Sequence, residues 1–157
     1  MFKTVVFATD GSETADRALP YAKALATGDG RTLVVVHSKE IMQGRPGGQP
    51  VLADEEDLEA KIAGQVEEAR KEGIDASFKV VSGTSPHAAH MIGDVANEIG
   101  ADVVVVGTRG HSTVAGLLLG SFTQRLLHIA SCPVLAVPAG KHRATQTDGR
   151  EAAATAS

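Results

Sequence analysis

The sequence predicts an open, doubly wound α/β fold built around one parallel sheet. Short β-branched runs alternate with amphipathic helical patterns along the chain, and the runs are apolar without an alternating polar face. Continuous apolar runs are typical of strands buried on both faces, as in a parallel sheet. The alternation places helices on both faces through right-handed crossovers. We therefore expect five parallel strands and about four helices in a single domain.

Five segments have the composition of buried strands, and valine dominates them. The fourth contains four consecutive valines, Val103–Val106. The predicted strands are Thr4–Thr9, Thr32–His37, Ala76–Val81, Asp102–Val106 and Val134–Val137.

Four segments, one between each two successive strands, repeat apolar residues at helical spacing. The stripes run over Ala15–Ala26, Leu58–Ala69, Ala88–Ile99 and Leu126–Ala130. Pro20 falls inside the first stripe and predicts a kink there, because proline lacks the N–H that an interior helical position donates. Gly28, Gly73 and Gly100 stand where helix ends are expected.

Helix starts also have sequence signals. Ser85 followed by Pro86 predicts an N-cap with proline at the first helical position. Ser121 with Gln124 matches a capping box. The acidic run Asp54–Asp57 suits the positive N-terminal end of a helix dipole.

Glycine and proline mark Met42–Pro50 as a loop. From Ala139 onward the chain has low complexity and no apolar period, which predicts a disordered tail over residues 139–157. The folded domain is therefore expected over residues 1–138.

Composition excludes several classes of function. The net charge of −4 and the lack of a basic block argue against nucleic-acid binding, although backbone N–H groups can still cradle a small anion. The lone Cys132 can form no internal disulfide and supplies no zinc cluster, so we read it as an inert buried thiol. The sequence has neither a signal-peptide pattern nor a membrane-span pattern, which predicts a cytoplasmic protein without membrane contact.

The stretch Gly107–Ser121, "GTRGHSTVAGLLLGS", is too long for an ordinary turn. Strand-to-helix connections usually take ~2–6 residues, whereas twelve separate Gly107 from Gly120. Its glycines permit close backbone approach, successive free N–H groups form an anion nest, and Ser121 opens a helix whose dipole favours negative charge. Neither a Walker A loop nor G-x-G-x-x-G is present. The alternative is a loop that closes over the sheet edge and is anchored by Leu117–Leu119.

The spacing Gly107-x2-Gly110-x9-Gly120-Ser121 resembles G-x2-G-x9-G-[S/T], the nucleotide-binding signature of ATP-binding universal stress proteins. The flanking segments "VVFATDGSETADRALPYAKALA", "ADVVVVGTRGHS" and "LLLGSFTQRLLHIASCPVLAVP" are similar to that family as well. The resemblance extends from about Lys3 to Pro138 and implies a Rossmann-like domain that binds ATP at the carboxyl edge of its sheet.

The resemblance also implies a role for particular residues. Ala8, Thr9 and Asp10 would line the adenosine end, and the backbone of Val36 would face adenine. The ribose and phosphates would be wrapped by Gly107, Arg109, Gly110, His111, Ser112 and Thr113. The phosphates would be held at the helix start by Gly120, Ser121, Phe122 and Thr123. Ala8 departs from the family, in which many members have proline, and His111 is a weaker permanent cation than lysine.

A triphosphate is normally carried with a divalent cation, so Mg²⁺ or Mn²⁺ is an implied partner. Asp10 is the nearest carboxylate candidate, directly or through water. Its alternative role is structural, in a turn with Gly11 and the helix cap Ser12. His87 and His90 have ligand spacing on a helix, but no third ligand is evident, which favours solvent-facing side chains.

Three functions follow from these observations. The first is a regulatory protein whose ATP occupancy sets its conformation or its partner, and the second is a slow ATPase. The third is a stress protein of the same fold that binds no nucleotide, which the intact glycine signature disfavours. No carboxylate in the loop is an obvious base, so we expect at most slow hydrolysis. The short apolar strand Val134–Val137 is expected at a sheet edge, and family members dimerise through it, which predicts a homodimer.

Overall fold

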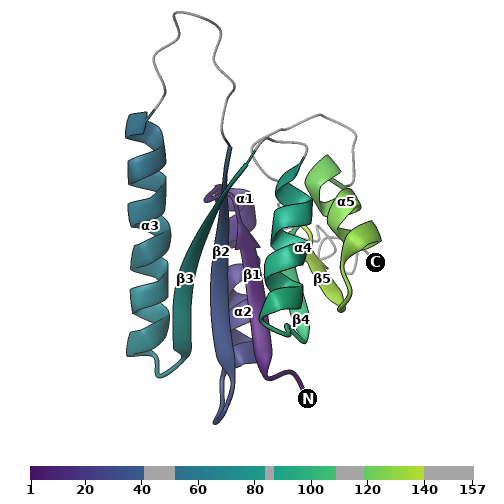
Figure 1. The fold of residues 1–157 in the computed structure, drawn as a ribbon. Helices are drawn as coiled ribbons and strands as arrows, with labels where there is room; N and C mark the ends of the chain where they lie inside the picture. The colour runs from purple at the N-terminus through teal and green to yellow at the C-terminus, as the bar shows by residue number, and fades with distance from the viewer. Residues whose placement is uncertain (41–51, 84–86, 109–118, 140–157) are drawn as a thin grey trace, which may run out of the picture.

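The computed structural model describes residues 1–40, 52–83, 87–108 and 119–139, in which strands and helices alternate (Figure 1). The strands are β1 (Thr4–Thr9), β2 (Thr32–Glu40), β3 (Asp75–Gly83), β4 (Val103–Gly107) and β5 (Val134–Val137). The helices are α1 (Glu13–Asp16), α2 (Leu19–Ala26), α3 (Leu52–Lys71), α4 (Ala88–Glu98) and α5 (Ser121–Ile129). The predicted loop at Met42–Pro50, the start signal Ser85-Pro86 and the tail past Ala139 lie outside the described residues.

All five strands form one parallel sheet in the order β3-β2-β1-β4-β5, which confirms the predicted doubly wound fold. β1 lies at its centre, and Phe7 is in register with Val35 of β2 on one side and Val105 of β4 on the other. β2 and β3 run past their predicted ends, because they continue to pair as far as Glu40 and Gly83.

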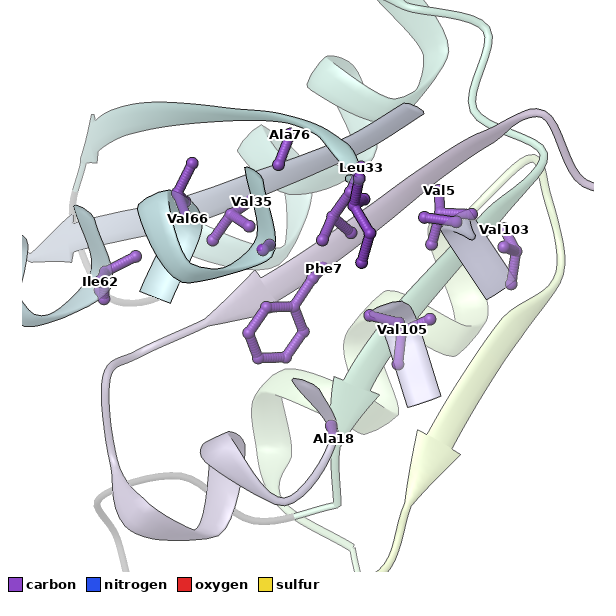
Figure 2. Close-up of a cluster of buried hydrophobic side chains, with 14 of the residues drawn as sticks. Val5, Phe7, Ala18, Leu33, Val35, Ile62, Val66, Ala76, Val103 and Val105 are labelled. Carbon is purple, nitrogen blue, oxygen red and sulfur yellow. The ribbon is translucent and has the colours of Figure 1, made fainter. Parts of the chain in front are cut away.

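The apolar core lies in two layers, one on each face of the sheet. Figure 2 shows the first, where Phe7, Leu33 and Val35 of the sheet pack with Ile62 and Val66 of α3. Alternate residues of the same strands face the other way and pack against α4 and α5. Both faces are therefore buried, which explains why the strands read as continuous apolar runs.

The predicted glycine ends of the helices are confirmed. Gly73 and Gly100 have φ of 83° and 65°, left-handed conformations that glycine adopts without a Cβ clash. Each glycine ends its helix in a Schellman motif. The longer-range hydrogen bond of the motif runs from the Ile74 N–H to the Ala69 carbonyl at 3.0 Å in the first helix, and from the Ala101 N–H to the Ala96 carbonyl at 2.8 Å in the second.

Pro20 does not kink a continuous helix, as the sequence predicted, because the chain forms two helices there. α1 ends at Asp16 and α2 begins at Leu19, so Pro20 lies in the first turn of α2. In that turn a backbone N–H has no intrahelical acceptor, and proline therefore costs no hydrogen bond.

The predicted capping box at Ser121 is also wrong. Gly120 is the N-cap of α5, with an extended conformation (φ −66°, ψ 153°), and no side chain caps this helix. Ser121 lies one residue inside the helix, where its hydroxyl is badly placed to accept from the first turn. The Gly120 carbonyl instead accepts the backbone N–H of Gln124 at 3.0 Å.

Asp102, predicted as the first residue of the fourth strand, lies just before β4. Its Oδ2 accepts the backbone N–H groups of Lys3 and Thr4, each at 2.8 Å. These hydrogen bonds hold the pKa of the Asp102 carboxyl below its usual range, and the bond from Thr4 has the larger effect. The side chain thereby fixes the start of β1 to the start of β4.

Candidate functional site

The carboxyl ends of β1 and β4 lie side by side at the middle of the sheet. Ala8 is in register with Val106, so the last residues of the two strands, Thr9 and Gly107, are neighbours. From this point the chain runs through β2 and β3 in one direction and through β5 in the other. Such a reversal of strand order is where open α/β sheets bind ligands.

The turn after β1 is held by its own side chains. Gly11 has φ of 75° and donates its N–H to Thr9 Oγ1 at 3.0 Å. Asp10 Oδ1 accepts both the N–H of Ser12 at 3.0 Å and the Ser12 hydroxyl at 2.6 Å. Ser12 Oγ in turn accepts the N–H of Ala15 at 3.2 Å, which makes it the N-cap of α1. The turn after β1 is therefore a defined structure whose Asp10 carboxylate is already hydrogen-bonded.

The two ends of the long glycine-rich connection meet at the carboxyl end of β4. Gly120 donates its N–H to the Thr108 carbonyl at 2.7 Å, and Thr108 donates to the Val137 carbonyl of β5 at 2.9 Å. The hydroxyl of Thr123 donates to the Gly107 carbonyl at 2.9 Å from a side chain that is only 2% exposed. The start of α5 is therefore fixed beside the end of β4.

The structure places most of the described site residues at this one edge. The side chains of Ala8, Thr9, Val36 and Thr123 are buried, so any contact they make with a ligand would involve the backbone. Ser121 is exposed, and Phe122 is partly buried against the α4 and α5 layer. The predicted residues Arg109, Gly110, His111, Ser112 and Thr113 lie outside the described residues.

Gly107 and Gly120 do not have a left-handed backbone. Gly120 has φ of −66°, and Gly107 is absent from the described glycines with positive φ, which are Gly11, Gly28, Gly30, Gly73 and Gly100. What glycine provides at this edge is therefore a backbone without a side chain, which other groups can approach closely.

One buried polar atom at the same edge has no partner among the described residues. Ser38 lies within β2, directly after the buried residue His37, and its Oγ makes no hydrogen bond with a described residue. Val36, two residues earlier, packs in the α4 and α5 layer with Ala8, and alternation along the strand places Ser38 on that same face. A polar group bound at this edge would satisfy the hydroxyl, and the edge thus fits a polar ligand.

Sequence reasoning missed His37, whose ring is 2% exposed at the carboxyl end of β2. Its Nδ1 lies 3.0 Å from the Thr9 carbonyl oxygen, and its Nε2 lies 2.6 Å from Glu55 Oε1 of α3. The available signals were a titratable residue ending an apolar strand and an acidic run that begins a helix. Nothing in the sequence indicates that the two would meet.

The remaining candidate residues are His87, His90 and Cys132, and the structure does not bring the three together. His87 and His90 are both exposed, as predicted. The pKa of the Cys132 thiol is raised, mainly by burial and to a lesser extent by the negative charge of the Asp102 carboxylate. In the described parts of the chain no three His, Cys, Asp or Glu side chains are grouped to hold a metal ion. Nor does any helix within those parts have the length and apolar character needed to cross a membrane.

Comparison with known proteins identifies relatives along the domain. The model of the universal stress protein family matches residues 1–138. A universal stress protein of Thermus aquaticus is 36% identical over 142 residues, covering 87% of this chain and 99% of the relative. A universal stress protein solved in complex with cAMP has a TM-score of 0.64 and 27% identity, covering 88% of this chain and 98% of its own. The universal stress protein from Archaeoglobus fulgidus in complex with dAMP has a TM-score of 0.62 and 27% identity, covering 87% and 98% respectively.

Proposed function

The chain belongs to the universal stress protein family, and on that premise we propose that it is a dimeric, cytoplasmic, ATP-binding regulatory protein. Nucleotide occupancy sets its conformation or its choice of partner. Hydrolysis is slow or absent. Asp10 is the nearest described carboxylate, and its hydrogen bonds to Ser12 hold it in the turn after β1, where it does not serve as a base.

The observation that carries this proposal is the meeting of β1, β4 and α5 at one edge. The Gly120 N–H to Thr108 carbonyl contact brings the start of α5 to the end of β4, and the β1 turn lies beside them. A helix start offers N–H groups and a positive dipole end to an anion. Solved relatives bound to cAMP and dAMP support an adenine nucleotide as the ligand.

The proposed assignment follows the signature residue by residue. Ala8, Thr9, Asp10 and Val36 lie toward adenosine. Gly107 and residues 109–113 enclose the ribose and phosphates, and Gly120–Thr123 receive the phosphates at the helix start. A bound Mg²⁺ or Mn²⁺ would neutralise phosphate charge, with Asp10 as its nearest carboxylate. The fit to a nucleotide rests on the Ser38 hydroxyl, which has no hydrogen-bond partner among the described residues, and on Gly107 and Gly120 at the two ends of the connection.

The direct test is to purify the protein without added nucleotide, denature it and identify what is released by absorbance and mass. We expect ATP. Release of nothing, together with no thermal shift on ATP addition, would leave a stress protein that acts through protein contacts alone. A steady-state turnover above about 1 s⁻¹ would instead make it an ATPase.

A substitution at the helix start locates the site. Gly120→Val is expected to abolish ATP binding, because a branched side chain would occupy the space of the phosphates. Gly64→Ala is the matched control, since a Cβ at Gly64 of α3 meets nothing within 4 Å. Circular dichroism should be unchanged in both variants. Normal ATP binding by Gly120→Val would refute this placement of the site.

The dimer is proposed to form through β5, which is an edge strand of the sheet. Leu135 on this strand is 38% exposed, and an uncovered apolar edge invites pairing with another chain. Light scattering at micromolar concentration should give the mass of a dimer, and Leu135→Lys should give that of a monomer. A monomeric wild-type protein would contradict the proposal.

A further inference from the structure

His37 is held between two acceptors that belong to different elements. Its Nδ1 contacts the carbonyl of Thr9, the last residue of β1, at 3.0 Å, and its Nε2 contacts Oε1 of Glu55 at 2.6 Å. The ring is buried, whereas the Glu55 side chain remains 21% exposed. The ring therefore bridges α3 and the carboxyl end of β1.

The two contacts fix the orientation of the ring. A backbone carbonyl can only accept, so Nδ1 carries the hydrogen of the contact with Thr9. Glu55 Oε1 holds the other ring nitrogen at 2.6 Å, so the carboxyl group of α3 and the carbonyl of β1 together determine how the ring lies.

A second contact from α3 reaches the same turn. Lys61 Nζ donates to the Gly11 carbonyl at 2.8 Å and pairs with Asp16 of α1 at 2.5 Å. Beside these contacts, Lys39 of β2 is paired with Glu59 of α3 at 3.1 Å. Helix α3 thus holds the β1–α1 turn at two points, Thr9 through His37 and Gly11 through Lys61.

We propose that His37, held in place by Glu55, is a positioning residue that sets the Thr9–Asp10–Gly11 turn for nucleotide binding. This inference rests on the proposed function, since the turn contributes Thr9 and Asp10 to the nucleotide site. Because the turn is oriented before binding, the cost of ordering it falls on folding instead of on association. Glu55 and His37 need not touch the nucleotide.

The experiment compares Glu55→Ala with Glu59→Ala. Both substitutions remove a paired carboxylate from one face of α3, one turn apart, but Glu59 contacts Lys39 and not the turn. We expect Glu55→Ala to weaken ATP binding about tenfold, the equivalent of one lost charged hydrogen bond. Glu59→Ala should change the dissociation constant less than about twofold. Isothermal titration calorimetry measures both.

Two further readouts separate positioning from a general loss of stability. Amide exchange of Gly11 and Ser12 without nucleotide should accelerate in Glu55→Ala and not in Glu59→Ala. The ¹⁵N shifts of His37 should show that Nδ1 carries a hydrogen, as its contact with the Thr9 carbonyl requires. Glu55→Gln should restore most of the affinity, because its side chain can still hydrogen-bond to Nε2.

The outcomes are distinct. If wild type binds ATP and Glu55→Ala binds as well as Glu59→Ala, the role of His37 is overturned while the proposed function stands. If wild type binds no nucleotide, the proposed function fails, and the inference for nucleotide binding fails with it. Equal amide exchange in the two alanine variants, or an Nδ1 without a hydrogen in wild type, overturns the inference in either case.

Discussion

The Thr123 hydroxyl donates a buried 2.9 Å hydrogen bond to the carbonyl oxygen of Gly107. The two residues are sixteen positions apart and stand at opposite ends of the glycine-rich connection. With the Gly120 to Thr108 contact, this bond fixes how the first turn of α5 meets the end of β4. It makes Thr123 a structural residue of the site before any ligand arrives.

Thr123→Val should therefore destabilise the protein by about 1–3 kcal/mol, the cost of removing one partner of a buried hydrogen bond. Valine keeps the shape of threonine, so the loss reports the hydroxyl and not the packing. Urea denaturation measures it, and Thr123→Ser, which keeps the hydroxyl, is the control. An unchanged midpoint for Thr123→Val would show that this bond adds nothing to stability.

Gly11→Ala should also destabilise the protein. Gly11 has φ of 75°, which costs a residue with a Cβ about 1–2 kcal/mol. A Cβ there would lie 2.6 Å from Cδ1 and Cγ of Leu58, so that side chain would have to move as well. Gly64→Ala in α3 should instead gain about 0.5–1 kcal/mol from helix propensity. Thermal melts of the two variants should shift in opposite directions, and a shared direction would contradict this account of Gly11.

Asp102 should give the protein an acid-sensitive contribution to stability. The backbone N–H groups of Thr4 and Lys3 lower the pKa of its carboxyl in the folded state. A lowered pKa means that the stabilisation is present above the unfolded-state pKa and is lost as pH falls through the folded-state value. Urea midpoints of wild type and Asp102→Asn should differ most near neutral pH and converge in acid. A difference that does not depend on pH would be inconsistent with this origin.

Cys132 should react slowly with thiol reagents. Burial raises the pKa of its thiol, and the nearby Asp102 carboxylate raises it further, so little thiolate is present at neutral pH. Alkylation by iodoacetamide should be slower in the folded protein than in urea. Asp102→Asn should accelerate it modestly in the folded state by removing the negative charge. Rapid alkylation of the folded wild type would contradict the interpretation of Cys132 as an inert thiol.

Local pattern was enough to predict the five strands and the glycine ends of two helices, but not every residue at which a strand or helix begins. The valine-rich runs predict strands because a β-branched side chain fits a buried sheet, and β1 and β5 have the predicted bounds. Gly73 and Gly100 end helices because only a residue without Cβ takes the left-handed position cheaply. Pro20 was misread, since its effect depends on where the helix begins and not on proline alone.

The arrangement at the carboxyl edge of the sheet was partly predictable for a similar reason. The G-x2-G-x9-G-S spacing marked both ends of the connection, and strand order placed them at one edge. The capping role assigned to Ser121 was wrong, because Gly120 is the N-cap and its carbonyl accepts the Gln124 N–H, while its own N–H donates to the Thr108 carbonyl. That contact joins segments whose separation in the chain carries no periodic signal.

By itself the sequence determined a five-stranded parallel α/β domain and the glycine ends of two helices, because each depends on the sterics and polarity of neighbouring residues. Tertiary structure alone decided that Thr123 holds Gly107, that α3 holds the turn after β1, and that His37 meets Glu55. These contacts arise only when the sheet brings strand ends and helix faces together, since buried polar groups must then find partners wherever the fold offers them.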